Sequence, residues 1–104
     1  METINRVVLK GGISGIRKIK IGNDEVARFV LLTRYSGKSR GGQVTEETEL
    51  HNVITWKSDD MFDILNDGKI AEVEGRIRYV KYITAEGFEK VLPEVVADKL
   101  ISVE

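Results

Sequence analysis

The stretch from Ile70 to Tyr82 constrains the fold most, because its side chains alternate in character over a long run. In an extended strand, successive side chains point to opposite faces. One face would then carry mainly small and apolar residues: Ala71, Val73, Gly75, Ile77, Tyr79, Lys81 and Ile83. The other face changes from acidic to basic and ends in an aromatic ring: Ile70, Glu72, Glu74, Arg76, Arg78, Val80 and Tyr82. The pattern predicts a strand with one core-facing side and one solvent-facing side.

The solvent-facing side of this strand places Arg76 and Arg78 near Tyr82. Cationic side chains beside an aromatic ring are suited to hold a phosphate chain and to stack its bases. An ordinary solvated strand face would contain the same residue types. The stretch alone therefore leaves both interpretations open.

Length and composition indicate one globular domain over residues 1–104, with 41% hydrophobic and 32% charged residues. The chain contains no cysteine, which excludes disulfides and thiolate metal sites. The first residues lack the apolar segment of a signal peptide, and no apolar run is long enough for a membrane span. We therefore expect a cytoplasmic protein that does not contact membranes.

The formal net charge of −1 argues mildly against nucleic-acid binding, because such domains are often basic. The charges are nevertheless segregated along the chain. Basic residues gather in three segments: 17–20, 34–40 and 76–81. Acidic residues gather in three others: 24–25, 46–49 and 59–67. Such blocks can give a nearly neutral protein with one positive groove.

Five segments have the alternation or the β-branched and aromatic content of strands: 4–21, 26–35, 44–56, 70–83 and 88–101. Gly11 and Gly12 predict a bend or bulge in the first of them. The basic, glycine-rich segment 36–43 predicts the tip of a long hairpin, whose return strand projects from the body in its first half. Pro93 predicts an edge position or a bulge in the last strand.

One helix is expected, and it lies between the third and fourth strands. Ser58 is a suitable N-cap, Asp59 and Asp60 suit the helix dipole, and Gly68 ends the helix. The apolar stripe of this helix has helical spacing: Met61, Ile64 and Leu65, with Phe62 beside it. The order of three strands, a helix and two strands predicts an all-β OB-fold, a five-stranded Greek-key barrel.

Four segments in this order resemble the bacterial single-stranded DNA-binding proteins, and the resemblance covers the whole chain. The segments are Asn5–Gly11 (NRVVLKG), Val26–Thr33 (VARFVLLT), Glu47–Ile54 (ETELHNVI) and Ala71–Tyr82 (AEVEGRIRYVKY). The chain is also similar to primosomal replication protein B, a relative without a tail. It stops at Glu104, so the long family tail, with the acidic tip that recruits repair proteins, is expected to be absent.

The resemblance implies that single-stranded DNA stacks on Trp56 and Tyr82, with Tyr35 as a weaker third ring. Leu50 replaces a family tryptophan, which removes one stacking platform. Trp56 could instead be a core residue under the helix. The basic residues that we assign to the phosphate path are Arg34, Lys38, Arg40, Lys57, Arg76, Arg78 and Lys81. Those near the hairpin tip could alternatively only solubilise a loop.

The resemblance also implies a homotetramer, or a dimer, which would lengthen the DNA path. The residues expected at the subunit interface are His51, Asn5, Arg6 and Val7. His51 is the only histidine and has no cysteine to share a metal ion with it. The aspartates between 59 and 67 do not match a calcium loop, and no Walker glycine loop is present.

We therefore expect a protein without catalytic activity, cofactor or metal. The first hypothesis is a sequence-tolerant single-stranded DNA-binding protein that acts in replication, recombination or repair. The alternative is an OB-fold module that binds other proteins in a primosome, replication or plasmid-transfer complex. The near-neutral charge and the replacement at Leu50 favour the alternative, whereas Arg78 and Tyr82 favour the first.

Overall fold

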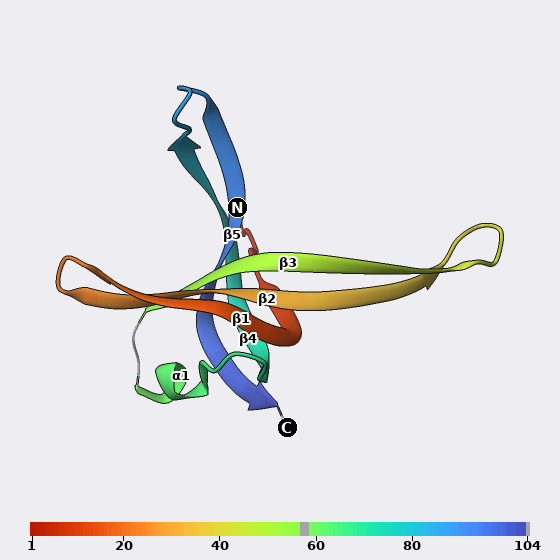
Figure 1. The fold of residues 1–104 in the computed structure, drawn as a ribbon, viewed down its shortest axis with the longest axis horizontal. Coiled ribbons are helices and arrows are strands. Elements are labelled where there is room, and N and C mark those ends of the chain that lie inside the picture. The colour runs from red at the N-terminus through yellow and green to blue at the C-terminus, as the bar shows by residue number, and fades with distance from the viewer. Residues whose placement is uncertain (57–58, 104) are drawn as a thin grey trace.

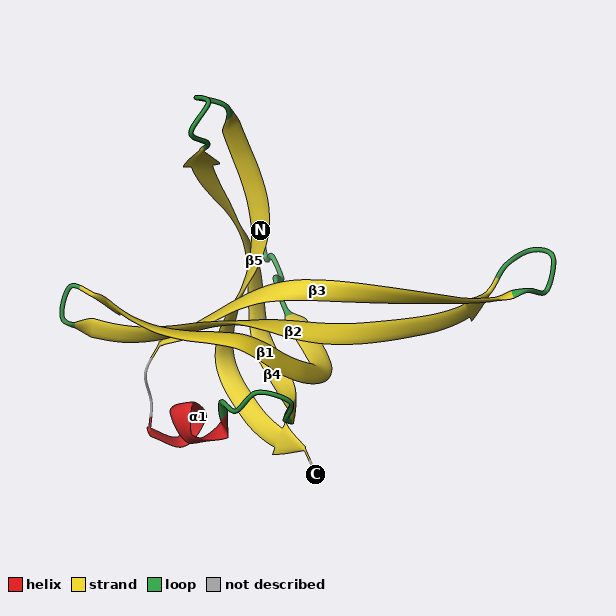
Figure 2. Cartoon of the chain, viewed as in Figure 1, coloured by secondary structure: helices red, strands yellow, loops and turns green. Residues whose placement is uncertain are grey.

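The computed structural model describes residues 1–56 and 59–103. These residues form strands with one short helix (Figure 2). The elements are β1 (Val7–Ile21), β2 (Asp24–Lys38), β3 (Val44–Trp56), α1 (Asp59–Ile64), β4 (Ile70–Ile83) and β5 (Glu89–Val103). The predicted order of strands and helix is confirmed. The proposed cap Ser58 and the phosphate-path residue Lys57 lie outside the described residues.

The strands close into a barrel in the order β1-β2-β3-β5-β4, with β1 also paired to β4. All neighbours are antiparallel except β3 and β5, which pair in parallel through Val53–Val95 and Ile54–Val96. Helix α1 lies in the connection between β3 and β4 and packs beneath the barrel as drawn in Figure 1. This arrangement is the predicted OB-fold.

Alternation along the strands produces the core. Ala71 and Val73 of β4 are both fully buried, as the sequence pattern predicted. They pack with Phe29 and Leu31 from β2 and with other buried residues from every strand. Phe62 and Leu65, from α1 and the residue that follows it, add to this cluster: α1 thus caps the barrel with its apolar side.

The β1–β2, β2–β3 and β4–β5 hairpins extend beyond the barrel in different directions (Figure 1). Residues 44–50 of β3 are all exposed, which confirms that the return strand projects in its first half. The Cα radius of gyration is 16.0 Å, whereas a compact domain of this length has about 13 Å. The β2–β3 and β4–β5 hairpins therefore present long surfaces that the core does not occupy.

The irregularity predicted in the first strand lies at a different place from the one that the sequence indicated. The irregularity in β1 lies between Ser14 and Arg17, where Gly15 has a φ of 62°, and not at Gly11 and Gly12. At Gly11 the backbones of β1 and β2 lie so close together that a side chain would not fit. A Cβ at this position would lie 2.0 Å from the carbonyl oxygen of Leu32.

The alternation places Tyr79 on the predicted core-facing side of β4, but its exposed fraction of 67% excludes the core of this chain. Pro93 does lie at a free edge, because β5 pairs with β3 only from Val95 onward. The described residues contain no helix that is long and apolar enough to cross a membrane.

Candidate functional site

One face of the β2–β3 hairpin continues onto one face of the β4–β5 hairpin. Residues directly opposite each other in an antiparallel ladder share a face. Trp56 is opposite Val26, Arg78 is opposite Glu94, and the ladders run on without shifts through the hairpins. We call this surface the groove face and define it by side chains from four strands: Arg28, Arg34, Asn52, Trp56, Arg76, Arg78, Val80, Tyr82, Leu92 and Glu94.

The two hairpins meet at a cluster of charged groups beside Trp56. The Arg78 guanidinium lies 5.9 Å from the centre of the Trp56 ring, which is within cation–π range. Arg78 also donates hydrogen bonds of 2.9 and 2.6 Å from Nε and Nη2 to Oε1 of Glu94. Arg28 Nε lies 3.7 Å from Oε2 of the same carboxylate. Glu94 thus joins arginines from β2 and β4.

A small apolar cluster is buried on the groove-face side of the strands. Val26, Ile54 and Val96 form a second buried cluster, separate from the main core. Trp56 is directly opposite Val26 of this cluster and is 40% exposed. Trp56 is therefore a surface ring on the groove face, and not a core residue under the helix. The residue can be reached by a ligand that enters the groove.

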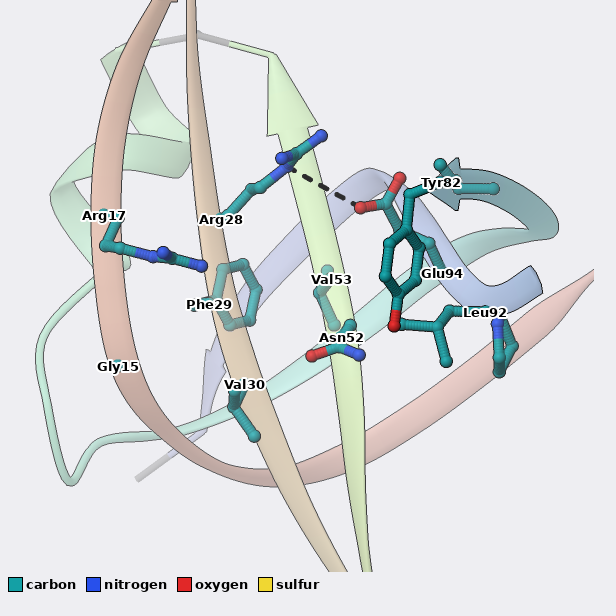
Figure 3. A pocket seen from close by; sticks show the side chains of 12 residues that line it. Gly15, Arg17, Arg28, Phe29, Val30, Asn52, Val53, Tyr82, Leu92 and Glu94 are labelled. Atoms are coloured by element: carbon teal, nitrogen blue, oxygen red, sulfur yellow. Dashed lines mark ion pairs between the residues drawn. The ribbon is translucent and has the colours of Figure 1, made fainter. Parts of the chain in front are cut away.

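A cavity of about 350 Å³ opens between the two hairpins (Figure 3). Arg17 and Arg28 lie on one side of it, Tyr82 and Leu92 lie on the other, and Asn52 lies between them. The Tyr82 ring is 41% exposed. The lining of the cavity therefore combines the rings of Phe29 and Tyr82 with an amide, two arginines and the Glu94 carboxylate.

The structure brings together only some of the residues predicted for DNA contact. Arg34, Arg76, Arg78, Trp56 and Tyr82 lie on the groove face. Tyr35 and Lys81 point to the other face of their respective hairpins, because each is directly adjacent in sequence to a residue of the groove face. Lys38 and Arg40 lie exposed at or beside the tip of the β2–β3 hairpin, far along the hairpin from the barrel (Figure 1).

Tyr35 and Lys81, which face away from the groove, have acidic neighbours. Tyr35 is directly opposite Glu47 and is 66% exposed. The Lys81 ammonium lies 3.3 Å from the Glu89 carboxylate. These surroundings are less favourable for a phosphate chain than the groove face, where Glu94 is shared between two arginines.

Residues expected at a subunit interface make contacts within the chain. The Asn5 side-chain amide donates to the Ile77 carbonyl at 2.7 Å and accepts from the Ile77 N–H at 3.0 Å, which extends the β1–β4 ladder. Arg6 forms an exposed ion pair with Glu74, and Val7 packs against the core. A role in subunit contact remains a prediction for these three residues.

His51, the other expected interface residue, is half-buried on the face opposite Trp56. Its Nε2 lies 2.8 Å from Thr33 Oγ1. Among residues 1–56 and 59–103, no three histidine or carboxylate side chains are placed to bind one metal ion. For His51 too, subunit contact remains a prediction.

Sequence reasoning missed Arg28, Glu94 and Asn52 as parts of the site. Arg28 could have been found, because it is the single charge in a strand segment whose neighbours Ala27 and Phe29 face the core. Glu94 carries no comparable signal. Its partner Arg78 lies directly opposite in the same hairpin, but Arg28 comes from a strand distant in sequence, and only the tertiary structure joins Arg28 to Glu94.

The sequence of the chain is similar to proteins of one family. The model of the single-strand binding protein family matches residues 4–103. The single-stranded DNA-binding protein of Xanthomonas axonopodis pv. citri is 32% identical over 101 residues, which cover 93% of this chain and 56% of that protein. The corresponding protein of Xylella fastidiosa is 31% identical over 101 residues, which cover 93% of this chain and 62% of that protein. The chain therefore spans about three fifths of the length of these relatives.

Solved structures share the fold at low sequence identity. The Plasmodium falciparum SSB, solved in complex with ssDNA, matches with a TM-score of 0.90 and 22% identity over 100% of this chain and 98% of that chain. A deletion mutant of the single-stranded DNA binding protein from Thermus aquaticus matches with a TM-score of 0.82 and 22% identity, over 97% and 51% of the two chains. These likenesses support the OB-fold.

Proposed function

Because this chain belongs to the single-strand binding protein family, we propose that it binds single-stranded DNA along the groove face, without catalysis and with little choice of sequence. The observation that carries the proposal is the contact of Arg78 with Trp56, at 5.9 Å from the ring centre. A ring with a cation beside it offers a stacking surface for a base and a charge for the attached phosphate.

Binding would use two kinds of interaction. Trp56 and Tyr82 each stack a base, and such stacking contributes about 1–3 kcal/mol per base for any base, because every base has a π-face. Arg28, Arg76 and Arg78 contact phosphates, which provides affinity that falls with salt but no sequence choice. The cavity beside Tyr82 has room for a base against Leu92.

The path beyond the groove follows the β2–β3 hairpin. Arg34 shares the groove face, and Lys38 and Arg40 lie near the hairpin tip. A strand that leaves the groove along this hairpin would meet these cations in turn. Tyr35 and Lys81 face away from this path, so a contact with them requires DNA to pass around the hairpins.

The proposed cellular role is protection of single strands in replication, recombination or repair in the cytoplasm, with no cofactor. A homotetramer or dimer would join several groove faces into a longer site. Exposed apolar side chains on the other face of the β4–β5 hairpin support association: Tyr79, Ile83 and Val91. The measurement for this part is the molar mass by sedimentation.

The test of DNA binding is a titration with oligo(dT), monitored by the fluorescence of Trp56, the only tryptophan. We expect quenching that weakens with salt. Tyr82→Leu should reduce affinity about 5- to 100-fold, the equivalent of one lost stacked base. Tyr35→Leu is the matched control, because it removes an exposed tyrosine from the opposite face, and it should change affinity less than twofold.

Two results would contradict the proposal. Equal losses from Tyr82→Leu and Tyr35→Leu would reject the groove face as the DNA path. Unchanged fluorescence together with no binding in a gel shift would reject DNA binding altogether, and would favour the alternative of a module that binds other proteins.

A further inference from the structure

Glu94 is the acidic member of the side chains that define the groove face, whose other charged members are arginines. Its side chain is only 12% exposed, whereas the side chains of its partners Arg28 and Arg78 are 40% and 37% exposed. The carboxylate therefore lies beneath the two guanidinium groups, and a ligand from solvent would meet the arginines first. This arrangement places one negative charge between the cations proposed to bind phosphate.

We propose that Glu94 competes with the DNA phosphate for Arg28 and Arg78, and so limits the affinity of the groove for single strands. This inference rests on the proposed function. In the free protein the carboxylate occupies donors that match a phosphate equally well, because the guanidinium fork binds either group in the same manner. Arg28, Arg78 and Glu94 together carry a net charge of +1, whereas the two arginines alone would carry +2.

The geometry around Glu94 shows how competition can occur. Arg78 is held firmly through two hydrogen bonds to one oxygen, at 2.9 and 2.6 Å. Arg28 is held loosely, because its Nε lies 3.7 Å from the carboxylate and has no hydrogen-bond partner among the described residues. A buried donor without an acceptor is costly, so a movement of Arg28 that brings its Nε to a phosphate oxygen would be favourable.

Glu94 also connects the charge cluster to Trp56. Arg78 contacts both the carboxylate and the ring. If a phosphate draws Arg78 away from Glu94, the cation moves relative to the Trp56 surface at which a base stacks. Competition at Glu94 would then affect the salt dependence and the stacking signal together.

The experiment compares Glu94→Gln with the wild type in oligo(dT) binding at several salt concentrations. Glutamine keeps an oxygen that can accept from Arg78 but removes the charge. We expect about three- to tenfold tighter binding at low salt. The plot of log affinity against log salt should steepen by about 0.7 for each additional phosphate that the freed arginines neutralise.

Glu89→Gln is the matched control, because Glu89 lies on the same strand and pairs with Lys81 on the opposite face. This substitution changes the net charge of the protein by the same amount but leaves the groove face unchanged, so the affinity for oligo(dT) should stay within twofold.

Arg78→Gln should weaken binding more in the Glu94→Gln background than in the wild type. A purely structural role of Glu94 would not produce this difference. Thermal unfolding checks the fold, and Glu94→Ala provides the same comparison if the glutamine variant does not fold.

The outcomes separate this inference from the proposed function. If the wild type binds oligo(dT) and Glu94→Gln binds equally or more weakly, or if Glu89→Gln tightens binding as much, competition by Glu94 is wrong and DNA binding stands. If no variant and no wild-type protein binds, both proposals are rejected.

Discussion

Replacement of Gly75 by alanine should strongly destabilise the protein. Gly75 is buried, and it pairs with Ala97 in the β4–β5 ladder, next to the shift in this ladder between Glu74 and Gly75. A Cβ at this position would lie 1.8 Å from the Val96 carbonyl oxygen and 3.0 Å from the Ala97 Cα. These are backbone atoms, so no side-chain rotation can relieve the clash.

The cost follows from the distance that the strands must move. An ordinary contact needs about 3.5 Å, so β4 and β5 would have to separate by more than about 1 Å. Overpacking of this kind costs about 1–3 kcal/mol, and each ladder hydrogen bond lost in the separation adds about 1 kcal/mol. We therefore expect a loss of about 2–4 kcal/mol in the free energy of unfolding. The melting temperature should fall by about 10–25 °C.

Urea unfolding, monitored by Trp56 fluorescence at one fixed protein concentration, measures this loss. Gly41→Ala is the control, because no atom lies within 4 Å of a Cβ at this exposed position. It should leave stability unchanged or raise it by less than about 1 kcal/mol through the unfolded state. A Gly75→Ala variant as stable as Gly41→Ala would show that the approach of β4 to β5 is not as close as the structure has it.

Other substitutions test individual contacts by the same unfolding assay. Thr55→Val removes the buried hydrogen bond of 3.2 Å to the Ala97 carbonyl and should cost about 1–2 kcal/mol; no loss would mean that water satisfies that carbonyl. Asn5→Ala removes both hydrogen bonds to Ile77 and should cost about 1 kcal/mol, with faster amide exchange at Ile77. Arg6→Gln breaks an exposed ion pair and should cost less than about 0.5 kcal/mol, so a larger loss would contradict its exposure.

Much of the fold follows from patterns that a single strand already contains. Alternation over Ile70–Ile83 placed Ala71 and Val73 in the core, and the structure confirms this. The same alternation failed beyond the barrel. Tyr79 continues the phase of the core residues but is exposed, because the β4–β5 hairpin extends past the body of the protein. The alternation of side chains shows which residues share one face of a strand. It does not show at which residue the rest of the protein ceases to cover that face.

The site was only partly accessible from the sequence. The resemblance to the family pointed to Trp56 and Tyr82, and the alternation of β4 pointed to Arg78 beside Tyr82; the structure places all three on one face. Arg28 and Glu94 were not identified as a pair. They are far apart in the chain, and their contact exists only because the two hairpins cross.

The sequence by itself determined the order of strands and helix, the membership of the core within the barrel and the residue types available to a ligand. These depend on local spacing, which each segment carries within itself. The tertiary structure alone decided which cations share a carboxylate, which ring lies beside a guanidinium and which predicted residues face away. These depend on the closure of the barrel and the crossing of its hairpins, which no segment encodes alone.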